Sequence, residues 1–413
     1  MIALPFIFFG TWAIRAFKNN GLSILTLILS FYAISAFFSI LIEVNGFYAA
    51  NSCPKTELGI LAPILYCMLI TMCIKPFAKI RNICITPLSN KAEKLLVLIS
   101  ALYCIVFVIV LCVAWDRMLF VLAAGDQIAE IRNEQYTGDA VSFYDHTSGL
   151  IRYVCAICAT LSQSSFLMLL VFGYMIAYSK MKVIYKILPL VGSFTPFIIS
   201  INIADRSQFV YWIIMLMFSL TVFHKNFNKK TKNVIIILVS CIIFFLLSYI
   251  MAVTTSRFAF RDGGVKGGLI LYAGQSYINF CRFINDIQPP LFSLNVVFPS
   301  ITHYIFHGDG YFDIVNKVGQ MNGNAPLAVF PTFLGIIYST CGPIVLFLFL
   351  VAYRLMANFV CGLFKRVQSF SSLIYLWIVA LVPTLGFIGY FYMGYNTAIM
   401  VIVWLIIAKI VNK

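Results

Sequence analysis

The chain has 413 residues, of which 62% are hydrophobic and only 10% are charged, and its mean hydropathy is +0.96. A soluble globular domain carries about 25% charged residues, so this composition excludes one. The net charge of +15 does not by itself indicate nucleic-acid binding, because the placement of the charges matters more than their number.

Apolar runs of about 18 to 25 residues recur along the chain, and an α-helix needs about 20 residues to cross a hydrocarbon core of about 30 Å. Strands of a membrane β-barrel would instead appear as segments of about ten residues in which apolar and polar residues alternate. We therefore predict an all-α polytopic integral membrane protein, a single membrane domain over residues 1–413 with eleven transmembrane helices. The first span is short, and a layout with a twelfth, N-terminal span is the alternative. The predicted spans are 2–16, 22–42, 58–74, 95–115, 153–178, 183–203, 209–223, 234–253, 329–355, 371–390 and 396–410.

The distribution of charge predicts which loops face the cytoplasm. When alternate loops are assigned to one side, that side receives 19 of the 29 basic residues and a single acid, Glu93, out of 14. By the positive-inside rule this side is cytoplasmic, which places the N-terminus outside and the C-terminus inside. Orientation beside anionic lipid thus accounts for the basic excess, and we expect no nucleic-acid partner.

Two predicted external loops are long, residues 116–152 and residues 254–328, and the second precedes the third-last span. The second loop is the only long stretch rich in charge, Gly, Asn and His. Near residues 268–287 its apolar residues recur at intervals of three and four, and polar residues keep the same rhythm on the opposite side. This pattern predicts an amphipathic helix at the membrane interface. The polar residues are Gln275, Asn279, Arg282 and Asp286.

Arginine is concentrated on the predicted external side, where it outnumbers lysine seven to three, whereas lysine outnumbers arginine 15 to four on the cytoplasmic side. Lysine suffices for orientation, but binding a phosphate through two parallel hydrogen bonds requires the planar guanidinium. Arg257 and Arg261 have i, i+4 spacing just outside the eighth span, and Arg206 lies in a short external turn. Together with Arg282 they predict a cationic site. The alternative is snorkelling at the interface or pairing with nearby acids.

The long loop also carries two histidines, His303 and His307, followed by Asp309. A zinc site needs a third ligand and a calcium loop needs more oxygen ligands than follow here, so we expect neither a metal nor a cofactor. The histidines suit a general base or a hydrogen-bond donor to sugar, with structural polar contacts as the alternative. Tyr272 and Tyr311 suit stacking against sugar rings or placement at the membrane interface.

Other motifs are uninformative or missing. Most of the 12 cysteines lie in apolar runs, where Cys acts as a small hydrophobic residue. Cys53 and Cys281 lie in predicted external loops and could pair, although nothing requires it. The chain has no Walker loop, GxSxG elbow or strand-borne GxGxxG, which disfavours a nucleotide-driven cytoplasmic enzyme. The first external loop, residues 43–57, lacks the Asp-x-Asp or Asp-Glu pair of metal-dependent glycosyltransferases that use lipid phosphosugars.

Several segments resemble one known family. The short turn NIADRSQFVYWII carries Arg206, SRFAFRD carries the arginine pair, and GDGYFDIVNKVGQMNGNAPLAVFPTFLGIIYSTCGP leads into a glycine-containing span with Asn324, Phe330, Gly335 and Gly342. With many spans and a long external loop before the last three, this pattern resembles the Wzy-type O-antigen and capsule polymerases, which join oligosaccharide repeat units. The resemblance covers most of the chain, but its motifs are degenerate.

The resemblance implies a membrane enzyme of the bacterial inner membrane. Such enzymes transfer a growing glycan from undecaprenyl diphosphate to a new lipid-linked unit at the outer face, and a chain-length regulator and a flippase would be partners. We expect a metal-independent, inverting glycosyl transfer in which arginines stabilise the leaving diphosphate. An O-antigen ligase would share that site and differ in acceptor, and a flippase or transporter would want charges deep within its spans.

These considerations give two sets of candidate residues. Those expected to act in catalysis are Arg206, Arg257, Arg261, His303 and His307. Those expected to bind the substrate are Tyr272, Gln275, Asn279, Arg282, Asp309, Tyr311 and Asn324. The sugar, the linkage and the oligomeric state do not follow from the sequence.

Overall fold

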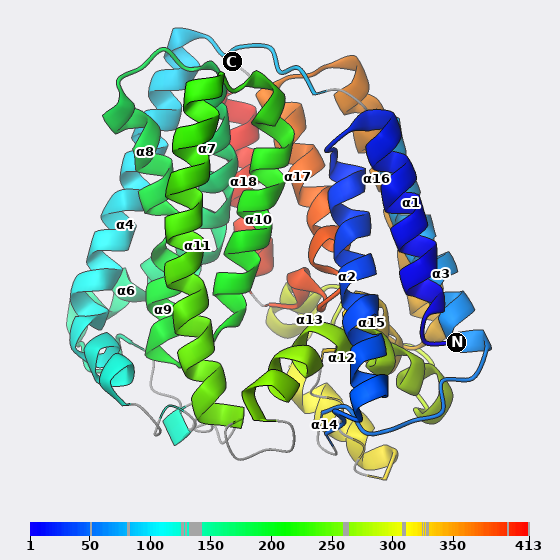
Figure 1. Ribbon diagram of the computed structural model, residues 1–413. Coiled ribbons are helices and arrows are strands. Elements are labelled where there is room, and N and C mark those ends of the chain that lie inside the picture. The colour runs from blue at the N-terminus through cyan, green and yellow to red at the C-terminus, as the bar shows by residue number, and fades with distance from the viewer. Residues whose placement is uncertain are drawn as a thin grey trace. The chain divides into compact units, whose positions relative to one another are not determined.

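The computed structural model describes residues 1–49, 52–80, 83–124, 128, 130–131, 143–258, 264–307, 311–323, 325, 327, 330–394 and 396–411. Within these residues the chain forms helices and no β-strand, apart from an isolated bridge between Ala49 and Cys53 (Figure 1). The predicted all-α class is therefore confirmed.

Eight helical segments of the described chain are long and apolar enough to cross a membrane. They are Ile24–Asn45, Leu61–Lys79, Asn90–Ala123, Gly149–Tyr178, Val183–Asn202, Ser207–Asn226, Lys229–Thr255 and Pro343–Arg366, and three shorter apolar helices are Thr332–Cys341, Phe370–Leu385 and Thr397–Val411. Each predicted span overlaps one of these segments or the first helix, Leu4–Asn20. The chain thus has the features of a multi-pass helical membrane protein.

The chain divides into two compact units. Unit 1 comprises residues 1–84, 266–368 and 372–398, and unit 2 comprises residues 85–265, 369–371 and 399–413. Both are assembled from segments that lie far apart in the sequence.

Unit 1 contains the first three helices together with α12 to α17. α1 packs along α2 and also contacts α3, and α15 contacts both α14 and α16 (Figure 1). Its helices are α1 (Leu4–Asn20), α2 (Ile24–Asn45), α3 (Leu61–Ile74) with the 3-10 helix η1 (Lys75–Lys79), α12 (Gly264–Asp286), α13 (Pro299–Tyr304), α14 (Tyr311–Met321), α15 (Thr332–Cys341), α16 (Pro343–Arg366), α17 (Phe370–Leu385) and the 3-10 helix η5 (Phe391–Met393).

Unit 2 is built around α4, which packs against α8 and α9, while α7 packs against α8 and α10 (Figure 1). Its helices are α4 (Asn90–Ala123), α6 (Gly149–Ser162), η3 (Gln163–Phe166), α7 (Leu167–Tyr178), α8 (Val183–Gly192), α9 (Thr195–Asn202), α10 (Ser207–Phe223), η4 (His224–Asn226), α11 (Lys229–Phe258) and α18 (Thr397–Val411).

Local sequence explains several helix ends. The Ser23 hydroxyl accepts a hydrogen bond from the Thr26 amide at the start of α2, and the Ser89 hydroxyl accepts one from the Ala92 amide at the start of α4. Gly46 ends α2 in the left-handed conformation that glycine adopts without strain.

Three predicted boundaries differ from the structure. α4 continues to Ala123 instead of ending at Trp115, because MLFVLA extends its apolar run, so the loop predicted to start at Asp116 starts later. The predicted span 329–355 is two helices, α15 and α16, since Gly342 has a φ of +93° and Pro343 cannot continue a helix. The predicted loop 254–328 contains the end of α11 together with α12, α13 and α14.

Aromatic packing places α12 inside unit 1. The ring centroids of Tyr66 and Tyr277 are 5.0 Å apart, and those of Tyr66 and Phe280 are 5.2 Å apart, so α3 and α12 are in contact. These three side chains are almost completely buried. Each large aromatic side chain buries about 150–250 Å², which makes this contact a main anchor of α12.

Candidate functional site

The strongest cluster of chemistry-bearing residues within one unit lies on α12. Gln275, Asn279 and Arg282 share one face of the helix, because their spacing is four and three residues. Their side chains are only 2%, 0% and 4% exposed. A helix is therefore present where an interfacial helix is predicted. Three residues of its predicted polar face are buried, whereas Asp286, the fourth, is exposed.

A short segment from the first predicted external loop contacts this face at Asn279 and continues to the end of α12. We call residues 52–58 the cover segment. The Asn279 side-chain amide donates to the Ser52 carbonyl at 2.9 Å, and the Asn285 amide donates to the Glu57 carbonyl at 2.9 Å. At the end of α12, the Thr56 hydroxyl donates to Asp286 Oδ2 at 2.9 Å.

Arg282 is the buried cation of this cluster. Burial lowers the pKa of its guanidinium, and Cys53 and Asp286 oppose that shift in part. The guanidinium carbon lies 4.9 Å from the centroid of the Phe283 ring, a favourable cation–π contact. A guanidinium removed from water binds an anion more strongly than an exposed one does, because the local dielectric constant is low.

Two amide oxygens on the same face have no hydrogen-bond partner among the described residues, Gln275 Oε1 and Asn279 Oδ1. A buried acceptor without a donor costs about 1–3 kcal/mol. The α12 site, which we define as Gln275, Asn279 and Arg282 together with the cover segment, thus offers two acceptors and one guanidinium. That combination matches hydroxyl donors and a phosphate.

The close approach of α12 to α2 depends on Gly274. The Ser39 hydroxyl donates to the Gly274 carbonyl at 2.5 Å, and the Ser35 hydroxyl donates to the Ala273 carbonyl at 3.0 Å. A Cβ atom on Gly274 would lie 2.5 Å from the Ser39 backbone nitrogen and 2.7 Å from the Phe38 carbonyl oxygen. Only glycine permits this contact, which fixes the helix immediately before Gln275.

Other predicted site residues of unit 1 are not part of the α12 site. Tyr272 lies on α12, half-buried, with its ring centroid 5.7 Å from that of Phe330. His303 is half-buried on α13, whereas His307 is exposed beyond the end of that helix with a φ of +49°. The two histidines have i, i+4 spacing but do not share a helix, because α13 ends at Tyr304.

In unit 2, Arg206 lies in the turn between α9 and α10. Its Nη1 donates to the Thr254 hydroxyl on α11 at 2.5 Å, and Arg117 Nε from α4 donates to the Asn202 carbonyl at 3.1 Å. Arg257 follows Thr254 by one turn of α11. We call Arg117, Asn202, Arg206 and Thr254 the Arg206 cluster.

Some predicted residues lie outside the described residues. These are Arg261, Asp309 and Asn324, together with the side chains of Arg257 and Tyr311. The part of the chain that is described holds no group of three His, Cys, Asp or Glu side chains able to bind a metal ion. Cys53 and Cys281 are both free thiols, and burial raises the pKa of each to about 12.

Sequence reasoning misses two features of these clusters. The cover segment belongs to a loop that lacks an acidic pair, and no local signal links residues 52–58 to α12. Arg117 is one of the arginines on the predicted external side but not one of the predicted site residues, since the sequence places it in a loop and not on α4. The excess of arginine over lysine on the predicted external side is a signal that applies to Arg117 as well.

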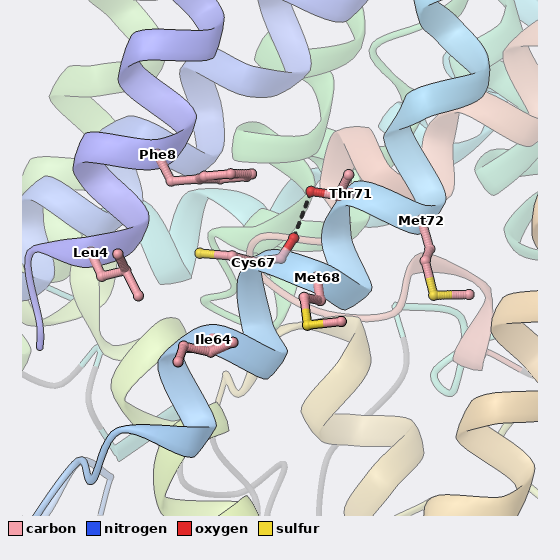
Figure 2. Close-up of a pocket in the computed structure, with 7 residues that line it drawn as sticks. All are labelled: Leu4, Phe8, Ile64, Cys67, Met68, Thr71 and Met72. Atoms are coloured by element: carbon pink, nitrogen blue, oxygen red, sulfur yellow. Dashed lines mark hydrogen bonds between the residues drawn. The ribbon is translucent and has the colours of Figure 1, made fainter.

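An apolar groove of about 460 Å³ lies elsewhere in unit 1, between α1 and α3 (Figure 2). Figure 2 shows that Leu4 and Phe8 from α1 and Ile64, Cys67, Met68, Thr71 and Met72 from α3 line it. The Thr71 hydroxyl donates to the Cys67 carbonyl of its own helix at 2.6 Å. The groove carries no charged or titratable oxygen or nitrogen group, so the α12 site is the better candidate for chemistry.

Comparison with protein-family models, with characterised proteins and with solved structures finds no match to this chain.

Proposed function

We propose that the protein polymerises lipid-linked oligosaccharide repeat units. In this proposal it transfers the growing glycan from undecaprenyl diphosphate to a new lipid-linked unit at the outer face of the bacterial inner membrane. The products are O-antigen, capsule or exopolysaccharide chains. The reaction is an inverting glycosyl transfer in which a sugar hydroxyl of the acceptor attacks the anomeric carbon and the lipid diphosphate leaves. The hydroxyl proton passes to a general base, for which His303 and His307 are the candidates.

The observation that supports this proposal best is the buried polar face of α12. Arg282 supplies a guanidinium for a phosphate oxygen, and the Gln275 and Asn279 side-chain oxygens supply acceptors for sugar hydroxyls. A glycosyl diphosphate presents both groups side by side. Stabilising the charge that develops on the departing diphosphate lowers the barrier, and this electrostatic effect is usually the largest in such a reaction.

The Arg206 cluster is a second candidate anion site, in unit 2. Arg206 is held by Thr254, and Arg257 follows on the same helix. Replacement of Arg257 and of Arg261 by lysine tests whether bidentate hydrogen bonding to phosphate is required. Lysine retains the positive charge but lacks the planar guanidinium that makes two parallel hydrogen bonds. Full-length polymer from both variants would remove these two residues from the proposal.

The decisive experiment is a deletion strain. A polymerase deletion leaves lipopolysaccharide capped with a single repeat unit, whereas accumulation of free lipid-linked polymer would identify a ligase instead. Unchanged long polymer would overturn both.

Complementation then tests the α12 site. Gln275→Leu should restore little polymer while leaving stability equal or higher, because it removes an unsatisfied buried oxygen. The matched control is Ser276→Ala, an equally buried position next in sequence, which should restore normal polymer. Normal polymer from Gln275→Leu would remove this residue from substrate binding.

A further inference from the structure

The apolar groove between α1 and α3 continues, on α3, to a lysine. Ile64, Met68, Thr71 and Met72 line the groove, and Lys75 follows Met68 by seven residues and Thr71 by four. The Lys75 amide bonds the Thr71 carbonyl, so Lys75 still has the α-helical register. Residues at these spacings share one face of a helix, and Lys75 therefore extends the groove-lining face of α3.

The groove-lining face of α1 continues to an arginine in the same way. Leu4 and Phe8 line the groove, and Arg15 follows Phe8 by seven residues and Leu4 by eleven. In Figure 2, Phe8 lies above Leu4 and Thr71 lies above Ile64, so α1 and α3 rise in the same direction. Arg15 thus lies toward the same end of the groove as the cation of α3.

These two cations have no protein anion to pair with. Arg15 and Lys75 are exposed, and neither has a hydrogen bond or an ion pair in the part of the chain that is described. Lys79, by contrast, donates to Asn358 Oδ1 at 2.7 Å. Residues 1–42, 58–84 and 343–368 of unit 1 contain eight lysines and arginines and no Asp or Glu. The helices of this region therefore do not supply the neutralising anion.

We propose that the groove binds one anionic phospholipid, with an acyl chain along the apolar walls and the phosphate at Arg15 and Lys75. The volume of about 460 Å³ lies within the range of about 300–1,000 Å³ that is typical of ligand sites. A guanidinium donates two parallel hydrogen bonds to a phosphate, and an ammonium adds a point charge. Basic residues at the cytoplasmic ends of membrane helices attract anionic head groups in the same way.

The position of the charge selects the leaflet from which the lipid comes. Arg15 and Lys75 both belong to the side that the charge distribution predicts to be cytoplasmic. Residues 1–14 and 56–74, which include the groove-lining residues and the opposite end, contain no Lys or Arg. A phospholipid of the cytoplasmic leaflet therefore fits the groove better than a carrier whose diphosphate lies at the outer face. The site is separate from the α12 site and does not depend on the proposed function.

The first experiment compares two lipids with identical acyl chains. The purified full chain in detergent is titrated with phosphatidylglycerol or phosphatidylcholine, and bound lipid is counted by native mass spectrometry. Each cation beside an anionic head group favours binding about fivefold, so phosphatidylglycerol should bind about 25-fold more tightly. The double variant Arg15→Gln, Lys75→Gln should lose this preference, and Lys365→Gln, an exposed position on α16, should retain it. Equal affinities for the two lipids, or a preference that the double variant retains, would overturn the proposal.

The second experiment locates the acyl chain. Phosphatidylglycerol with a photoreactive diazirine in one acyl chain is irradiated with the full chain in phosphatidylcholine vesicles, and the cross-linked peptides are identified by mass spectrometry. Cross-links should concentrate on α1 and α3. Met68→Trp, which fills the groove, should reduce them severalfold, whereas Leu355→Trp, at an exposed position on α16, should not.

Two other outcomes would contradict the proposal. Cross-links spread evenly over the exposed apolar residues would identify contact with bulk lipid only. Displacement of the photoreactive lipid by polyprenyl diphosphate, equally from the unmodified chain and from the double variant, would assign the groove to the carrier instead. Neither experiment measures glycan formation, so failure of the proposed function would leave both results interpretable.

Discussion

Gly274 offers a direct test of how α12 is held in place. Replacement by alanine would put a Cβ atom 2.5 Å from the Ser39 nitrogen and 2.7 Å from the Phe38 oxygen, both backbone atoms that cannot rotate away. α2 and α12 must therefore separate locally. Their separation weakens the hydrogen bonds from Ser35 and Ser39, which are 3.0 and 2.5 Å long.

The expected cost follows from these contacts. Overpacking costs about 1–3 kcal/mol. Each of the two hydrogen bonds contributes about 0.5–1.5 kcal/mol. Alanine regains about 1 kcal/mol through its higher helix propensity. We therefore expect Gly274→Ala to lower the free energy of unfolding by about 1–5 kcal/mol.

The measurement is thermal unfolding in detergent, followed with a thiol-reactive dye that reports exposure of buried cysteines such as Cys67 and Cys281. Gly362→Ala is the matched control, because a Cβ atom on this glycine of α16 would have no other atom within 4 Å and its φ is not positive. The control should be as stable as the unmodified chain or slightly more so. Equal unfolding temperatures for the two variants would refute the close contact between α2 and α12.

Two further predictions concern single side chains. Thr254→Val removes the hydroxyl that accepts from Arg206, so it should destabilise the chain by about 1.5–3 kcal/mol in the same assay. Thr255→Val, an exposed neighbour whose hydroxyl donates to the Met251 carbonyl of its own helix, should change stability little, and equal effects would contradict the Arg206–Thr254 contact. Burial raises the pKa of Cys53 from 9.0 to about 12, so its contribution to stability is complete below pH 9 and is lost as pH rises from 9 towards 12. Stability should fall by about 1.4 kcal/mol per pH unit in that range for this thiol, and Cys53→Ala should flatten the slope measured between pH 8 and pH 10.

The sequence predicts the helices well because apolar length and periodicity are local properties. The predicted helix near residues 268–287 corresponds to α12, Gly264–Asp286, since its intervals of three and four are set by helix geometry. The predicted end of α4 and the unbroken span across Pro343 are wrong for opposite reasons. The first is too short, because the apolar run of α4 continues beyond Trp115. The second is too long, because Gly342, within one apolar stretch, has a φ of +93° that ends the helix.

The candidate site is predicted only in part. Periodicity shows that Gln275, Asn279 and Arg282 share a face, but it does not show what covers that face. Residues 52–58, more than two hundred positions earlier in the chain, contact it at Asn279, and their contacts to Asn279 and Asn285 use backbone carbonyls, which every residue has. No pattern of side chains could have identified it. For the same reason, the interfacial position of this helix stays a prediction.

The arginines illustrate a different limit of sequence reasoning. The sequence predicts one cationic site from four arginines. Arg206 and Arg257 belong to unit 2 and Arg282 belongs to unit 1, so their grouping into one site stays a prediction. The Arg206 guanidinium already has a protein partner, Thr254, which satisfies part of its hydrogen-bonding capacity. On α12, by contrast, the two amide oxygens have none among the described residues, although the Asn279 amide nitrogen donates to the Ser52 carbonyl. A buried acceptor without a donor costs about 1–3 kcal/mol, and a ligand that donated a hydrogen bond to it would offset that cost. The α12 face, more than the arginines of the turn, is therefore the place to test function first.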